Sequence, residues 1–381
     1  MKNRLFSIGL TSIIISLALT RVCLAEQDQL GQITFLSGDA QVKGAKETVW
    51  RKAELNMPVF FGDNIRTRED GKVTITFVDG SLLKIHSNTH IALNTIVSPV
   101  EKKSSVLLFF GRMWNKVSRK VLKMKAVEIQ TPTAVLGVRG TEFETGAYED
   151  GTMIVRVDSG GVTVDNEIDR STLSSNEGTQ LSLVTRKIKT EPDFRPEWER
   201  IEKTSRESLF ADGERYGGHV NKEIYRRRDH LKGLVDKAKK LSEERERFLS
   251  LAEEAKERGD EIGYESSMAK TKKINKEIGD LNKRIAFYGR RLECHFGLFS
   301  HYGYLAKHPE YSKQFRGKEF ILKQLDNIEM IYAEFNAMIE EGMKMSMEDM
   351  EDLMDEMKEK VRKFRRKREK KDPFDEMDED F

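Results

Sequence analysis

The chain has 381 residues, of which 34% are charged and 38% hydrophobic, and its formal net charge at pH 7 is +2. This length predicts two or three domains, and the share of charge predicts that much of the chain is solvated, elongated or coiled-coil-like. The near balance of charges argues against nucleic acid as a partner, because dedicated nucleic-acid binders carry a one-sided basic surface.

Residues 1–25 have the features of a secretory signal peptide. Two basic residues precede an apolar stretch, and Cys23 and Ala25 fit the small-x-small pattern before a cleavage site. We therefore expect cleavage after Ala25 and a periplasmic mature protein. An uncleaved anchor and a lipid-attached Cys23 are the alternatives. The apolar run is short for a membrane span, however, and Val22 is not the small residue expected before a lipidated cysteine.

The mature chain is expected to be peripheral to a membrane at most. No later segment of the sequence reaches the ~20 apolar residues that a transmembrane helix needs. Once the signal peptide is removed, Cys294 is the only cysteine, which rules out a disulfide within the chain. We expect Cys294 to be a half-buried thiol on a helix face.

Residues 26–190 are expected to form an all-β domain. Short runs in which apolar and polar residues alternate, such as 72–78, are separated by turn residues such as those at 69–71. The pattern leaves a roll, a sandwich and a short solenoid open as architectures.

Asp79 and Gly80 have the composition of a two-residue hairpin turn. That register would pair Ile75 with Lys84 and would place a lysine on the apolar face of the strand. A longer connection, or a strand buried on both faces, is therefore the alternative.

The composition changes near residue 191, where two prolines precede a region rich in Lys, Arg and Glu. Apolar residues recur at heptad-like spacing on both sides of Gly259, which predicts a helical hairpin over 191–295. We expect an aromatic connector and amphipathic helices over 296–371, and an acidic tail over 372–381. Apolar helix faces of this kind can pack against each other within one chain or between chains, so a homo-oligomer formed through the helices is an alternative.

Three blocks of the β region supply the candidate interaction or structural motif. Its members are Gly62, Asp63, Asp79, Gly80, Thr131, Pro132, Gly137, Arg139, Gly140 and Thr141. Pro132 should start a strand or lie on an edge, and the glycines permit positive φ or close backbone approach. Arg139 is expected to stay internal and bridge a carboxylate such as Glu142 or Asp63; a ligand-facing side chain is the alternative.

These blocks resemble the FecR domain family over residues 31–184, most specifically in the run TPTAVLGVRGTEF at 131–143. The resemblance implies an extracytoplasmic sensor or interaction module. Regulators of that family are single-pass membrane proteins that couple an outer-membrane receptor to a cytoplasmic sigma factor. This sequence shows neither a cytoplasmic segment ahead of the β region nor an internal span. We therefore expect this chain to share the β module of the family but not its role in sigma-factor regulation.

We expect no catalytic residues, no cofactor and no metal. The sequence has no P-loop, no His-Glu-Xaa-Xaa-His helix and no Gly-Xaa-Ser-Xaa-Gly elbow. His295, His301 and His308 are irregularly spaced beside a single cysteine, which does not fit a metal-binding pattern. His86 and His90 are expected to be solvated or to cap turns.

The leading hypothesis is an exported, non-enzymatic interaction or sensing protein of the periplasm. Its β domain would bind an envelope protein or a glycan, and its helices would serve as a spacer or an oligomerisation arm. The alternative is a structural, wall-associated oligomeric protein of the envelope. An enzyme with a site in the aromatic connector ranks third, because no activity can be named for it.

Overall fold

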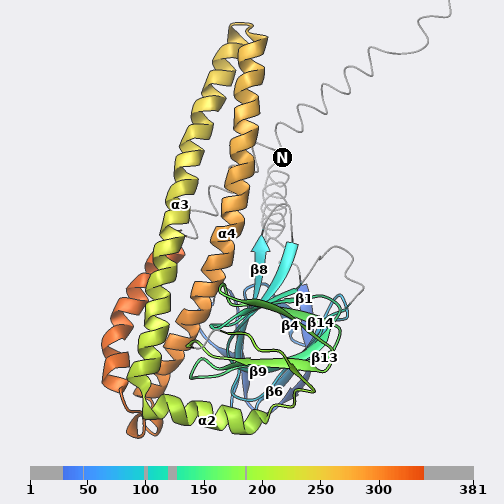
Figure 1. The fold of residues 1–381 in the computed structure, drawn as a ribbon, viewed down its shortest axis with the longest axis vertical. Coiled ribbons are helices and arrows are strands. Elements are labelled where there is room, and N and C mark those ends of the chain that lie inside the picture. The colour runs from blue at the N-terminus through green and yellow to red at the C-terminus, as the bar shows by residue number, and fades with distance from the viewer. Residues whose placement is uncertain (1–28, 46, 98–101, 119–126, 185–186, 339–381) are drawn as a thin grey trace, which may run out of the picture.

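The computed structural model describes residues 29–45, 47–97, 102–118, 127–184 and 187–338. The expected signal peptide, the last expected helix and the acidic tail lie outside these residues. The described chain forms a β domain followed by long helices (Figure 1), which confirms the predicted order of a β region and then an α region.

The β domain is built from two sheets that share one strand. Sheet A has the order β4 (Pro58–Phe60), β1 (Gln29–Ser37), β6 (Lys72–Phe77), β7 (Leu82–Ile85), β9 (Lys102–Lys116), β12 (Glu142–Ala147), β13 (Met153–Ser159), β16 (Glu177–Leu181) and β17 (Glu191–Pro192). Sheet B has the order β3 (Arg51–Lys52), β2 (Ala40–Lys43), β5 (Asn64–Thr67), β8 (His90–Val97), β9, β10 (Val127–Gln130), β11 (Val135–Val138), β14 (Gly161–Asp165) and β15 (Arg170–Ser174). Of these pairings only β9–β10 is parallel.

The two sheets enclose one apolar core. Alternate residues of the strands are buried, as the sequence pattern predicts, and Ile75 of sheet A and Ile65 of sheet B belong to the same buried cluster. The architecture is therefore a two-layer sandwich, one of the alternatives that the sequence left open.

Strand β9 passes from one sheet to the other. Its residues 102–110 pair with β8 in sheet B, and its residues 111–116 pair with β12 in sheet A. Gly111, between the two halves, has a φ of +104°, and a Cβ there would lie 2.4 Å from the Cα of Thr89. The change of sheet therefore requires glycine at this position.

The β6–β7 connection resolves the conflict around Asp79 and Gly80. Ile75 pairs with Leu83, and Thr74 pairs with Lys84. The connection is thus longer than two residues, and Gly80 adopts a φ of +82° within it. The lysine consequently stays on the outer face.

The described helical region consists of four α-helices and one short 3-10 turn. These are α2 (Trp198–Ala211), α3 (Gly213–Glu257), α4 (Glu261–Lys307), the 3-10 turn η1 (Tyr311–Lys313) and a helix whose described part covers residues 318–338. α3 and α4 form the expected antiparallel hairpin, which turns at Gly259 with a φ of +74° (Figure 1). In the described chain, no helix combines the length and the apolar composition that crossing a membrane requires.

The expected boundary at 295/296 falls inside α4. The aromatic residues that suggested a connector lie on a continuous helix, where Phe296, Phe299 and Tyr302 are buried at helical spacing. Gly297 belongs to the same helix, and a Cβ there would lie 2.3 Å from the ring of Phe109. This glycine lets α4 approach sheet B closely instead of ending the helix.

Replacing Gly111 with alanine should lower the free energy of unfolding by at least about 3 kcal/mol, because it adds backbone strain and a clash with Thr89 where the two sheets join. Urea unfolding of the full chain measures the change. The matched control is Gly279→Ala in α4, where an added Cβ meets open space. That variant should change stability by no more than about 1 kcal/mol. Equal effects of the two changes would contradict the role given to Gly111.

Candidate functional site

The structure divides the predicted motif between opposite ends of the β domain. One end, which we call the far rim, consists of residues 78–81, 117–118, 139–141 and 159–160. These loops touch one another: the Ser118 amide donates to Ser81 Oγ at 3.0 Å, and the Val117 amide donates to the Thr141 carbonyl at 2.9 Å. The far rim thereby brings together Asp79, Gly80, Arg139, Gly140 and Thr141 from two of the sequence blocks.

Arg139 is exposed on the far rim, which corrects the expectation of an internal side chain. Val138 points into the core, so strand alternation turns the next side chain outward. The two expected partners are engaged elsewhere: Glu142 pairs with Lys116 at 2.6 Å, and Asp63 Oδ2 accepts a hydrogen bond from the Phe60 amide at 2.9 Å.

Three other motif residues serve the β domain itself. Gly62 has a φ of +87°, and a Cβ there would lie 2.4 Å from the Cβ of Ala45. Asp63 is buried next to it, and burial raises the pKa of its carboxyl group. Gly137 is exposed within β11. These three positions do not join the far rim.

Thr131 and Pro132 lie at the opposite end, which we call the docking end because the helices pack there. Both residues are buried. Thr131 Oγ1 donates to the Ala134 carbonyl at 2.9 Å, and the Thr131 carbonyl accepts from Arg291 Nη1 of α4 at 2.8 Å. This part of the motif therefore binds the chain's own helical region, a role that the sequence did not suggest.

Glu167, in the turn between β14 and β15, is the first of two carboxylates that fix the helices. Its Oε1 lies 2.6 Å from Arg227 Nη1 of α3 and 3.3 Å from Arg291 Nε of α4. Burial by itself would raise the pKa of Glu167, but Arg227, Arg291 and Arg226 together outweigh it and lower the pKa to about 2.

Glu149, in the turn between β12 and β13, is the second. Arg206 of α2 binds both of its oxygens, at 2.9 and 3.1 Å, and His301 Nε2 of α4 lies 2.8 Å from Oε1. The Tyr302 hydroxyl donates to the Glu149 carbonyl. Burial raises the pKa of Glu149, yet His301 and Arg206 overcome it and lower the pKa to about 2. Both carboxylates are therefore ionised at neutral pH and suited to holding structure rather than to general acid catalysis.

The apolar part of the docking end explains the position of Cys294. It lies in one buried cluster with Ala92, Leu107 and Phe109 of sheet B. The thiol is 0% exposed instead of half-buried, and burial raises its pKa to about 12. Such a thiol is poorly suited to nucleophilic chemistry or to pairing between chains.

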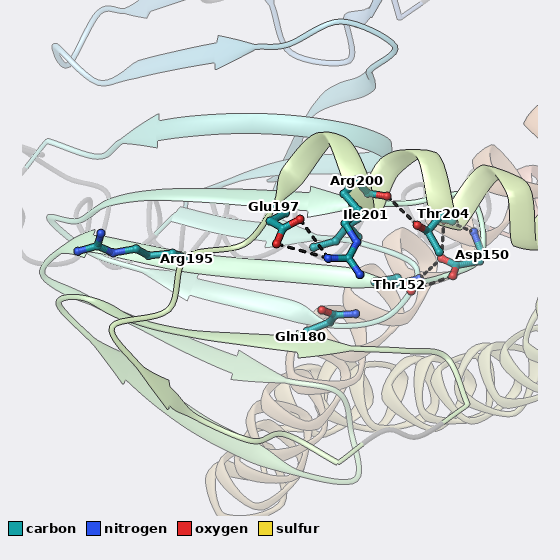
Figure 2. A pocket seen from close by; sticks show the side chains of 9 residues that line it. Asp150, Thr152, Gln180, Arg195, Glu197, Arg200, Ile201 and Thr204 are labelled. Carbon is teal, nitrogen blue, oxygen red and sulfur yellow. Dashed lines mark hydrogen bonds and ion pairs between the residues drawn. The ribbon is translucent and has the colours of Figure 1, made fainter.

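A shallow pocket of about 350 Å³ lies between the β12–β13 turn and the start of α2. Figure 2 shows that several of its polar groups bind one another rather than converge on an empty space. Arg200 Nη1 donates to Glu197 Oε2 at 3.2 Å, and Ser205 Oγ donates to Asp150 Oδ1 at 2.6 Å. Across the described ranges, no three His, Cys, Asp or Glu side chains are grouped so as to hold a metal ion.

The fold and its motifs define an extended β-sandwich module with an attached helical hairpin. Residues 63–163 match the family described as FecR protein, so the β domain is a FecR-family domain. A comparison with curated proteins finds no match.

Solved structures offer partial likenesses. Two crystal structures described as "a putative anti-sigma factor from Parabacteroides distasonis" are 23% identical to this chain; each match covers 34% of this chain and 59% of the other, with a TM-score of 0.30. This chain thus spans less than two thirds of that protein. A structure described as a cell surface anchoring domain is 34% identical over 17% of this chain and 84% of its own, with a TM-score of 0.16.

Replacing Glu167 with glutamine should lower the free energy of unfolding at pH 7 by about 2 kcal/mol, because the buried guanidinium groups of Arg227 and Arg291 lose a carboxylate partner that is itself partly exposed. A folded-state pKa of about 2, against an ordinary value of 4.5, means that this stabilisation is present above pH 4.5. It is lost as the pH falls from 4.5 toward 2. Urea unfolding at a series of pH values measures both effects.

The matched control is Glu265→Gln, at an exposed position on α4. It should leave both the stability and its pH dependence unchanged. If Glu167→Gln also left the acid-induced loss of stability unaltered, the docking role of Glu167 would be refuted.

Proposed function

We propose that this chain is an exported, non-enzymatic sensing or interaction module of the periplasm. In this proposal the FecR domain binds an envelope protein or glycan, and the far rim is its partner-binding end. The observation that carries the proposal is the division of the motif. Thr131 is bound by Arg291 of α4 and Pro132 beside it is buried, whereas Arg139 and Gly80 are left exposed at the other end.

The chemistry of the described residues supports a binding role. The carboxylates of Glu149 and Glu167 are ionised and paired with guanidinium groups, and several polar groups of the shallow pocket bind one another. An exposed arginine on a rim of interlocked loops is suited to recognition of a partner, because a guanidinium group offers several donors in a fixed plane.

The helical hairpin supports a second candidate function, that of a structural envelope protein. α3 has 45 residues, which corresponds to about 68 Å at 1.5 Å per residue. Its upper part projects away from the β domain (Figure 1). An arm of this length can act as a spacer, or it can associate with a second copy.

Export predicts a defined mature N-terminus. The protein purified from the envelope fraction of the cells that make it should have an intact mass that begins at Glu26, because a signal peptidase would cut after Ala25. A chain that retains Met1, or one that carries lipid on Cys23, would contradict cleavage at this site.

The far rim predicts a partner that can be captured in cells. A photoreactive residue in place of Arg139 should crosslink to one envelope component, and the same residue in place of Glu265 on the hairpin should not. Mass spectrometry of the crosslinked species identifies the partner. If the Arg139 probe reached only a second copy of this chain or bulk wall material, the structural function would replace the sensing function.

A further inference from the structure

The outer face of sheet B is only partly covered by α4. The helix packs on Leu107 and Phe109, whereas the strands toward β2 and β3 lie outside that cluster. At the border stands a set of cations and aromatic rings that we call the basic–aromatic patch. Its members are Lys43, Trp50, Arg66, Arg68 and Tyr304.

Arg66 is the centre of this patch. Its guanidinium carbon lies 4.1 Å from the ring centroid of Trp50, and its Nε donates to Gln41 Oε1 at 2.7 Å. The stacking and the hydrogen bond fix the plane of the guanidinium group. The terminal Nη atoms are thereby left free to bind a carboxylate or phosphate in a bidentate manner.

The cations of the patch lack carboxylate partners. In the part of the chain that the structure describes, no ion pair within 4.0 Å involves Arg66, Arg68 or Lys43, and Arg68 instead lies 5.7 Å from the Tyr304 ring centroid. The pKa of Arg66 is lowered, first by burial and then by the charge of Arg68, and the attraction of Asp39 does not compensate. Positive charge is therefore concentrated here, and among the described residues no carboxylate lies within 4.0 Å of these three cations.

The pKa of His90, next to the patch, is affected by the same positive charges. The sequence led us to expect a solvated or capping residue, but the imidazole is half-buried with its Nε2 shielded from solvent, and its ring centroid lies 5.4 Å from that of Trp50. Burial, followed by the charges of Arg66, His301 and Lys43, lowers its pKa to about 3. Its Nε2 has no hydrogen-bond partner among the described residues. The base of the patch is thus neutral, and the surrounding side chains are cationic.

We infer that the basic–aromatic patch binds an anionic glycan, with an acidic group of the sugar on the Nη atoms of Arg66 and a sugar ring against the exposed aromatic surface of Tyr304. Tyr304 is 43% exposed, and Gln41 supplies an amide next to the guanidinium group. The centre of a protein–protein interface is normally depleted of charge, which disfavours a folded protein partner at a cluster of three cations. The inference goes beyond the proposed function, because it assigns a ligand to a surface other than the far rim.

Titration calorimetry of the full chain with a galacturonic acid hexamer tests the inference. Binding should weaken by at least ~10-fold in Arg66→Gln, since a charge-assisted bidentate pair contributes on that scale. Arg66→Lys should lie between the wild type and Arg66→Gln, because a lysine keeps the charge but loses the planar fork. Arg68→Gln is a second variant that leaves the stacked pair intact, and it should weaken binding to a smaller extent.

Arg258→Gln is the matched control, because it removes an exposed arginine at the hairpin turn, outside both the patch and the far rim, and should leave affinity for the hexamer unchanged. Maltohexaose, which has the same length and no charge, should not bind. Equal affinity of the wild type and Arg66→Gln would overturn the inference. Tighter binding of poly-glutamate than of the hexamer would replace the glycan with an acidic peptide. Capture from Arg139 tests the far rim separately, so either idea can fail without the other.

Discussion

The ion pairs of two carboxylates, one buried and one partly buried, determine how the two halves of this protein fit together. Glu149 and Glu167 sit in turns of the β-sandwich, where water no longer solvates them fully, and each requires cationic partners. Arg206 of α2, together with Arg227 of α3 and Arg291 of α4, supplies them from all three of these helices. Because such pairs depend strongly on geometry, they fix the base of the hairpin on the sandwich more precisely than apolar contact alone would.

This arrangement leaves the FecR domain with one surface covered by helices and other surfaces exposed. The docking end and the β9 side of sheet B are occupied by the chain's own helices, through Thr131 and the cluster around Phe109 and Cys294. What stays open is the far rim, with Arg139, and the patch around Arg66 at the edge of α4. The helical region thereby covers one end of the domain, and in our proposal the surfaces left exposed are those that a partner would contact.

Local patterns were reliable where a residue's immediate neighbours decide its conformation. The alternation along β6 predicted a half-buried strand, and Gly259 marked the hairpin turn. The same local reasoning failed where distant segments meet. Cys294 is buried where sheet B and α4 pack on each other, and His90 is half-buried against Phe109 of sheet B. The aromatic run after residue 295 is a helix because sheet B and the helix at 318–338 cover it. The sequence next to these residues does not indicate which distant surface covers them.

The sequence by itself determined the order of a β domain and a helical hairpin, and it determined the FecR motif, because periodicity and glycine placement act over a few residues. Only the tertiary structure decided that this motif is split between two ends of the sandwich, with Thr131 bound by α4 and Arg139 left exposed. The physical reason is that burial and charge pairing depend on which surfaces meet in three dimensions. Glu167 and Arg291 are 124 positions apart in the chain yet share one partly buried ion pair.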